Sequence, residues 1–141
     1  MALTREEREQ FLAEPHIGAL AVNATDGQAP LTVPIWYQYR PGGELWIITG
    51  STSRKGRLIE AAGRFSLLAD RTEPTIRYVA VEGPVTSTEP ATRDHVQEMS
   101  ARYLAADKLD AYVEFALREH RDQVVMRMRP ERWFSSDLGR L

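Results

Sequence analysis

Turn signals set at hairpin distance limit the first half of this chain to an antiparallel arrangement. Asp26-Gly27 separates an apolar run at residues 17–23 from a branched and aromatic run at residues 31–39, and Pro41-Gly-Gly43 precedes a third run at residues 44–49. Short glycine-containing loops join antiparallel neighbours, whereas parallel strands need a longer crossover. We therefore predict a largely antiparallel sheet that closes into a barrel.

The rest of the chain adds further strands and several helices to this sheet. Thr4 and Glu7 have the spacing of a capping box, and Gly63 follows a short helical run. Gly83-Pro84 interrupts a long strand, where we expect a bulge or bend. Helices are predicted over residues 5–14, 56–62, 92–104 and 107–119, and strands over residues 17–23, 31–39, 44–49, 64–70, 77–87 and 123–129, with Trp133-Phe134 in an apolar tail. The fold class is mainly β with flanking helices (α+β).

Composition restricts the protein class. The 141 residues fit one domain, over residues 1–141, which can bury roughly 70% of its unfolded surface. Because the chain has no cysteine, disulfide scaffolds, thiolate metal sites and cysteine nucleophiles are excluded. A net charge of -2 gives no electrostatic case for nucleic acid or a membrane surface as partner. The charged first nine residues do not form a signal peptide, and no window has the apolar length of a membrane span, so we expect a cytoplasmic protein.

Familiar catalytic motifs are missing from the sequence. His16, His95 and His120 lie far apart and form no metal-binding pair, so no metal site is predicted and a surface or capping role explains them better. The sequence also lacks a Gly-x-Ser-x-Gly elbow, a P-loop and a Gly-x-Gly-x-x-Gly fingerprint, which removes the usual signs of hydrolases, nucleotide triphosphatases and dinucleotide enzymes.

The segment Thr49-Gly-Ser-Thr-Ser-Arg-Lys-Gly-Arg57 concentrates four hydroxyls and three cations between a strand end and a helix start. Hydroxyls, cations and a helix N-terminus together hold phosphate oxygens through charge-assisted hydrogen bonds. In that interpretation Lys55 acts as a point charge, with Arg54 or Arg57 as forks. The alternative is a plain polar loop in which Ser53 is the N-cap of the helix. The residues alone leave both interpretations open, with the plain loop slightly favoured.

A second cue is the run Leu31-Thr-Val-Pro-Ile-Trp-Tyr-Gln-Tyr39. Alternation puts Val33, Ile35 and Tyr37 on one face and Thr32, Pro34, Trp36 and Gln38 on the other. Pro34 cannot donate to a strand ladder, so it indicates an edge, a bulge or a position that faces a ligand. Taken by itself, this run is better explained as an aromatic-rich barrel strand.

In this order, the motifs resemble those of the split β-barrels similar to pyridoxamine phosphate oxidase and FMN-binding protein. Within that superfamily they are most similar to the flavin/deazaflavin oxidoreductases, over residues 10–135. The motifs that carry the resemblance are the Asp26-Gly27 turn, Thr32-Val-Pro-Ile-Trp-Tyr37, Leu45-Trp-Ile-Ile-Thr49, Ser53-Arg-Lys55, Ile59-Glu-Ala-Ala, Phe65-Ser-Leu and Val81-Glu-Gly83.

The resemblance implies a homodimer with two cofactors at the subunit interface. The cofactor phosphate would lie on Ser51–Lys55 and the tricyclic ring along Thr32–Trp36, with the partner subunit approaching from the strand that carries Arg77-Tyr78. It thereby favours the phosphate interpretation of the polar loop. The expected cofactor-binding residues are Thr32, Val33, Pro34, Ile35, Trp36, Thr49, Ser51, Ser53, Arg54, Lys55 and Arg77.

The chain ends without the basic C-terminal pattern of enzymes that oxidise pyridoxamine phosphate, so vitamin B6 oxidation is not expected. Short members resemble the enzymes that use the deazaflavin coenzyme F420. We therefore expect a reductase that transfers hydride from reduced F420 to a small electron-poor substrate such as an enone, a quinone or a tetrapyrrole. The alternatives are an FMN-dependent flavin oxidoreductase and a non-catalytic cofactor carrier or sensor. No catalytic acid is assigned, Tyr37 and Tyr39 are the candidates considered as proton donor, and the helices over residues 92–119 are expected to cover a barrel end.

Overall fold

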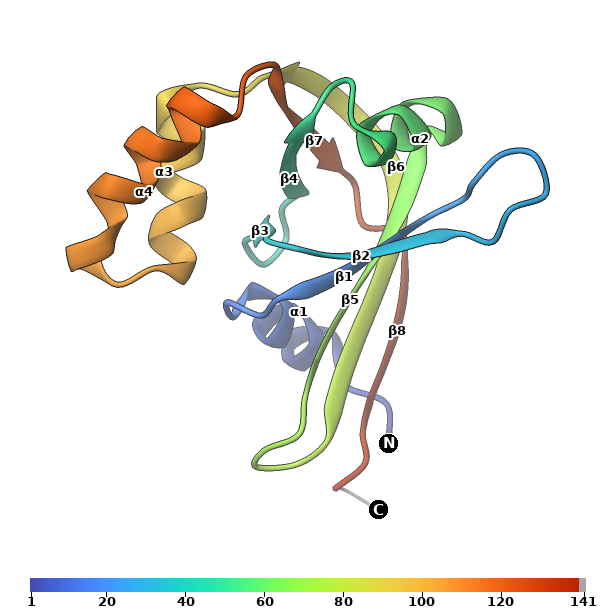
Figure 1. Cartoon of the computed structure of the whole chain (residues 1–141). Helices are drawn as coiled ribbons and strands as arrows, with labels where there is room; N and C mark the ends of the chain where they lie inside the picture. The colour runs from blue at the N-terminus through green and yellow to red at the C-terminus, as the bar shows by residue number, and fades with distance from the viewer. Residues whose placement is uncertain (140–141) are drawn as a thin grey trace.

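One antiparallel sheet organises the computed structural model, which describes residues 1–139 (Figure 1). Its strand order is β2-β1-β5-β6-β7-β4-β3, and β8 pairs with β6 beside this path. The strands are β1 (Gly18–Val22), β2 (Leu31–Ile35), β3 (Gln38–Tyr39), β4 (Leu45–Gly50), β5 (Arg64–Arg71), β6 (Arg77–Pro90), β7 (Gln123–Met128) and β8 (Arg132–Asp137). The helices are α1 (Arg5–Ala13), α2 (Arg54–Ala62), α3 (Arg93–Tyr103) and α4 (Ala106–Glu119). All strand pairs among the described residues are antiparallel, which confirms the prediction from the turn signals.

The sheet curls because its two outer strands are consecutive in the chain. β2 and β3 stand at opposite ends of the strand order, yet only Trp36 and Tyr37 separate them. Connecting the two ends in this way gives a half-barrel with the main core inside it. The predicted closure is therefore incomplete, because β2 and β3 do not pair with each other. That core contains Phe11, Leu12, Leu20, Tyr37, Tyr39, Leu45, Ile47, Ile59, Leu67, Val79, Met126 and Met128.

β6 is the strand that pairs with different neighbours along its two halves and so joins both parts of the barrel. Its first half pairs with β5 and β8, and its second half pairs with β7. The change of partner coincides with a register shift between Val85 and Ser87, just after the predicted bulge at Gly83-Pro84. β6 also continues to Pro90, three residues beyond its predicted end. The interruption is thus a local irregularity within one continuous strand.

Two parts of the predicted pattern differ from the structure. The run at residues 31–39 is two strands, because the Tyr103 hydroxyl takes the place of a ladder partner at Tyr37. It accepts from the Tyr37 amide at 3.1 Å, and its proton is shared between the carbonyl oxygens of His16 at 2.8 Å and Tyr37 at 3.0 Å. The expected C-terminal tail is strand β8, which pairs with the first half of β6 and puts Phe134 opposite Ala80.

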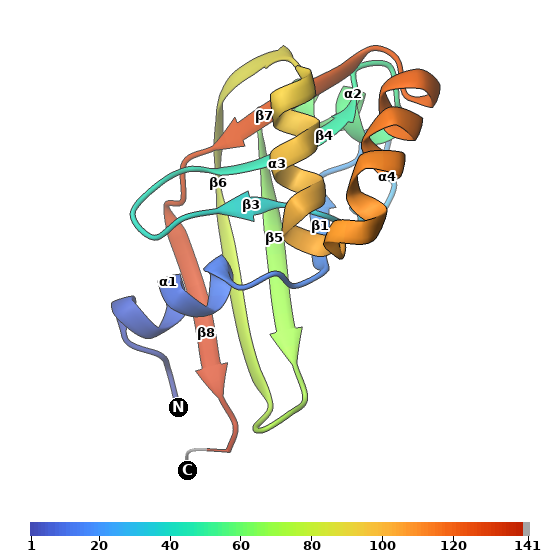
Figure 2. The same ribbon diagram turned by 90° about the vertical axis from the view of Figure 1, so that its left-hand side faces the viewer.

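The helices lie at three separate parts of the barrel (Figure 2): α1 packs against β3 and β6, α2 packs against β1, β4 and β5, and α3 and α4 lie together. α1 begins with the predicted capping box of Thr4 and Glu7. α3 and α4 form a hairpin that lies over β4 and β7 (Figure 2), where Met99 packs with Trp46 and Val125. Arg102, at the end of α3, donates to the carbonyl oxygens of Ala13 and Glu14, each at 2.7 Å. This arginine therefore links the helical hairpin to the end of α1 by hydrogen bonds.

Candidate functional site

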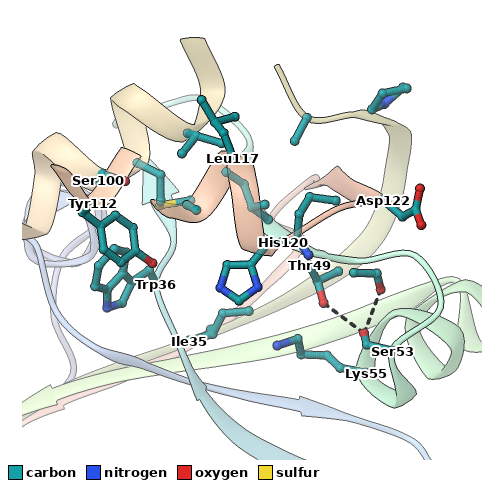
Figure 3. Close-up of a pocket in the computed structure, with 18 of the residues that line it drawn as sticks. Ile35, Trp36, Thr49, Ser53, Lys55, Ser100, Tyr112, Leu117, His120 and Asp122 are labelled. Carbon is teal, nitrogen blue, oxygen red and sulfur yellow. Dashed lines mark hydrogen bonds between the residues drawn. The ribbon is translucent and has the colours of Figure 1, made fainter. Parts of the chain in front are cut away.

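A pocket of about 860 Å³ lies between the α3–α4 hairpin, the edge strand β2 and the N-terminus of α2 (Figure 3). The strands contribute Pro34, Ile35, Ile48, Thr49 and Gly50, and α2 with its cap contributes Ser53 and Lys55. α3, α4 and the segments that flank them complete the lining with Pro90, Ala91, Val96, Met99, Ser100, Tyr112, Ala116, Leu117, His120, Asp122 and Gln123, and Ile17 and Trp36 lie beside β1 and β2.

The N-terminus of α2 is held tightly against the end of β4. The Ser53 hydroxyl accepts from the Gly56 amide at 3.1 Å and donates to the Gly50 carbonyl at 2.7 Å. A Cβ at Gly56 would lie 2.3 Å from the same Gly50 oxygen, so this close approach requires glycine. The N-cap interpretation of Ser53 is therefore confirmed, and its hydroxyl proton is used inside the loop.

Lys55 is the one cation that reaches the pocket from α2. Its side chain is partly buried and extends into the pocket (Figure 3), and within residues 1–139 it forms no hydrogen bond or ion pair. Burial lowers the pKa of its ammonium group below the ordinary value. The first turn of α2 contains no acidic residue to balance this charge or the helix dipole. The positive end of the α2 dipole and the Lys55 ammonium group therefore lie together at this end of the pocket.

The structure brings together six of the eleven residues expected at the cofactor site. Pro34, Ile35, Trp36, Thr49, Ser53 and Lys55 all line the pocket. Within β2 the predicted alternation is confirmed, since Ile35 is buried while Thr32 and Pro34 are exposed. Beyond the strand it is wrong, because Gln38 is buried as Tyr37 is. β2 pairs with β1 alone, so Pro34 occupies an edge strand, as one of the interpretations of this proline predicted.

The other five expected residues lie outside this pocket. Thr32 faces outward and Val33 packs against the core. The Ser51 amide donates to the Asp122 carbonyl at 2.9 Å, which links the polar loop to the segment after α4. Arg54 is exposed and donates to the side-chain oxygen of Gln28 at 2.9 Å.

Arg77 is the most distant of these five, because it begins β6 whereas Pro90, at the other end of the strand, lines the pocket. Its guanidinium pairs with Asp137 at 2.8 Å. Burial alone raises the pKa of Asp137, but hydrogen bonds from Arg77, Gly139 and Thr75 and the charge of Arg77 outweigh it and lower the pKa to about 2. Within this chain, Arg77 has the structural task of neutralising that carboxylate.

Neither tyrosine considered as a proton donor reaches the pocket. The Tyr37 hydroxyl donates to the Leu12 carbonyl at 2.7 Å, and burial raises the pKa of this phenol. The Tyr39 hydroxyl donates to Glu9 at 3.2 Å, and burial raises its pKa to about 12. Both phenols are held in the core beside α1, so that guess is not supported by their positions.

α3 and α4 line the pocket, whereas the sequence analysis expected them only to cover a barrel end. Val96, Met99 and Ser100 of α3 and Tyr112, Ala116 and Leu117 of α4 form one wall of the pocket. Trp36 completes this wall, with its ring centroid 5.4 Å from that of Tyr112 and 4.9 Å from that of Tyr103. Amphipathic periodicity identifies the packed face of a helix but not the pocket that this face borders.

Two classes of site are not found in the described part of the chain. Residues 1–139 contain no group of three or more histidine, cysteine or acidic side chains placed to hold a metal ion. No helix among them combines the length and apolarity that crossing a membrane would require.

Comparison with known proteins identifies the fold and the family. The family described as pyridoxamine 5'-phosphate oxidase matches residues 4–137, whereas no curated protein matches. An F420 reductase is 24% identical, with a TM-score of 0.71 and coverage of 89% of this chain and 94% of that one. A conserved hypothetical protein of Mycobacterium tuberculosis is 24% identical, with a TM-score of 0.73 over 97% of this chain and 86% of that one.

A FAD-binding protein of Mesorhizobium loti is 23% identical, with a TM-score of 0.68 over 97% of this chain and 96% of that one. These likenesses identify the curled antiparallel sheet as a split barrel. Since the family match extends from the capping residue of α1 to the last residue of β8, the chain belongs to the pyridoxamine 5'-phosphate oxidase family.

Proposed function

We propose that this protein is a reductase that uses coenzyme F420 to deliver hydride to an electron-poor organic substrate. The observation that carries the proposal is Lys55, a partly buried cation without a protein partner among the described residues, at a helix N-terminus that opens into a large pocket. Similarity to an F420 reductase supports the choice of deazaflavin.

The pocket residues suit a ligand with an anionic end and a flat ring. Lys55 would bind the phosphate as a point charge, aided by the dipole of α2. Pro34 and Ile35, on edge strand β2, would border the ring. When bound, reduced F420 supplies a hydride, and the protein's part is to bind, orient and shield the reactants.

FMN is the second candidate cofactor, because its phosphate would satisfy Lys55 equally well. The similarity to a FAD-binding protein favours this flavin alternative. Either cofactor could also be held without turnover, which would make the protein a carrier or sensor. The relative affinity for F420 and FMN distinguishes the two cofactors, and hydride transfer to an acceptor distinguishes an enzyme from a carrier.

We expect the purified apo-protein to bind F420 more tightly than FMN, with micromolar affinity for F420. The measurement is a paired fluorescence titration of the same protein preparation with the two cofactors. Tighter binding of FMN would replace the deazaflavin proposal with the flavin alternative. Failure of both to bind would contradict a cofactor-dependent function.

We also propose that the protein is a homodimer whose interface lies on the outer face of the sheet, next to the pocket. Strand register aligns Pro34, Ala19, Leu68, Ala80 and Phe134 in one row across β2, β1, β5, β6 and β8. Directly paired residues point to the same face, and Leu68 and Phe134 are 38% and 52% exposed. An apolar row of this kind fits a second copy of the chain, and Pro34 joins it to the pocket.

Phe134→Glu combined with Leu68→Glu should convert this dimer into a monomer, because the interface would bring carboxylates of like charge from both copies together. Light scattering after size exclusion should then change from twice the chain mass to 16.0 kDa. Phe115→Glu is the matched control, since Phe115 is also exposed but lies on α4. A wild-type mass of one chain, or a dimer that survives the double substitution, would contradict the proposed interface.

A further inference from the structure

Two of the three histidines have their ring nitrogens engaged in local structure. His16 Nε2 lies 3.1 Å from the Phe11 carbonyl oxygen at the end of α1. His95 Nδ1 accepts from the Thr92 amide at 3.0 Å, which completes the capping box of α3. The sequence predicted a surface or capping role for the histidines; His95 has the capping role, and His16 contacts the last turn of α1.

His120 differs from them. It is the C-cap residue of α4, where its backbone amide donates to the Ala116 carbonyl at 2.9 Å. Its ring meets Phe115 edge-on, with 5.8 Å between centroids, and neither ring nitrogen hydrogen bonds to a residue in the range 1–139. The ring lies in the pocket between Lys55 and the wall of Trp36 and Tyr112 (Figure 3).

The pocket therefore has two chemically different halves with His120 between them. The half beside α2 is polar and contains Thr49, Ser53, Lys55, Asp122 and Gln123. The half beneath the helical hairpin is apolar and aromatic, with Trp36, Val96, Met99, Tyr112, Ala116 and Leu117. A phosphate-bearing cofactor matches the polar half, which leaves the aromatic half for another molecule.

We propose that the aromatic half binds the hydride acceptor, a planar apolar molecule with a conjugated carbonyl, and that His120 donates the proton to its carbonyl oxygen. This inference rests on the proposed function, because the hydride comes from the reduced cofactor. Hydride adds to the acceptor carbon conjugated with the carbonyl, the π electrons move to oxygen, and the N–H of the His120 imidazolium supplies the proton. The neutral imidazole then regains a proton from solvent.

The choice of His120 follows from the chemistry of the pocket side chains. Imidazolium is a stronger acid than the alcohol of Ser100 or the phenol of Tyr112, so it transfers a proton to an enolate or hydroquinone oxygen more readily near neutral pH. Lys55 is the other cationic donor of the lining, and it belongs to the polar half. An exposed C-cap position without a side-chain hydrogen bond also allows substitution without loss of the fold.

A planar oxyanion tests this site in the apo-protein, without any cofactor. The probe is 4-nitrophenolate, whose absorbance changes when its oxygen accepts a hydrogen bond. We expect His120→Gln to weaken its binding about tenfold, which is the loss of one charge-assisted hydrogen bond. His95→Gln is the control and should bind normally, because glutamine at this position preserves a capping box. Equal affinity in His120→Gln and wild type, or a loss seen only in Lys55→Ala, would overturn the assignment.

Turnover provides the second measurement. With reduced F420 and 2-cyclohexen-1-one, His120→Gln should lower kcat by about a hundredfold, the usual contribution of a general acid, and leave cofactor affinity unchanged. An unchanged kcat would overturn the proton-donor role. If 4-nitrophenolate binding depends on His120 while F420 does not bind, the acceptor subsite stands and the proposed cofactor is wrong. If F420 binds but 4-nitrophenolate binding does not depend on His120, the proposed cofactor stands and the acceptor subsite is wrong.

Discussion

Lys55→Ala should weaken cofactor binding ten- to hundredfold and leave the fold intact. The side chain is partly buried and its ammonium group is unpaired among residues 1–139, so its removal takes away a charge-assisted contact with phosphate and breaks no hydrogen bond or ion pair within the described part of the protein. Such a contact contributes about 1.5–3 kcal/mol, which corresponds to the expected loss. Because burial disfavours the ammonium form, the apo-protein should be at least as stable after the substitution. Titration with F420 measures the first effect, and thermal unfolding of the apo-protein measures the second.

The chain contains a matched control for this experiment. Its only other lysine, Lys108, is exposed on α4, and Lys108→Ala should bind cofactor as the wild type does. Arg54→Ala, one position before Lys55, tests whether the exposed outer side of the helix start also holds phosphate. A normal affinity in Lys55→Ala would contradict the phosphate assignment, and a greater loss in Arg54→Ala would move the phosphate to the outer side.

Local signals predicted most of the fold. Glycine-containing turns fixed the antiparallel connections, and hydroxyl or glycine caps marked helix ends at Thr4, Ser53 and Gly63. These signals act over a few residues, so a single sequence contains them in full. The break after Ile35 had no such signal, because the hydroxyl that replaces the ladder partner of Tyr37 comes from Tyr103, 66 positions after Tyr37. β8 was missed for the same reason, since only pairing with the distant β6 makes it a strand.

The sequence predicted the candidate site only where a short connection or a strand-edge signal places the residues. The polar loop and the edge strand converge because β4 leads directly into α2 and because Pro34 belongs at an edge. Neighbours in sequence nevertheless diverge in space, as Arg54 points to Gln28 while Lys55 enters the pocket. His120 and the helical wall depend on how α3 and α4 pack over the barrel, and no motif in the sequence encodes that packing.

Gly83→Ala should destabilise the fold more than any surface substitution. A Cβ at residue 83 would lie 1.8 Å from the Arg129 carbonyl oxygen, which is backbone and cannot rotate away. The connection from β7 to β8 crosses β6 at this point: the Arg129 amide donates to the Pro84 carbonyl at 3.0 Å, and the Glu131 amide donates to the Glu82 carbonyl at 2.9 Å. Displacing the β7–β8 connection to make room for the Cβ would strain both hydrogen bonds, at the point where β6 changes from pairing with β5 to pairing with β7. Overpacking and the weakened bonds together should cost about 3–5 kcal/mol.

Thermal unfolding of Gly83→Ala should then begin about 10 °C below that of the wild type, given the usual relation for a domain of this size. Gly42→Ala is the comparison, because Gly42 has a φ of 80° and open space around its added Cβ. Its cost is backbone strain alone, about 1 kcal/mol. A similar loss in the two variants would show that the crossing connection yields easily, and the corner of the barrel would then depend on the register shift after Val85 rather than on the glycine.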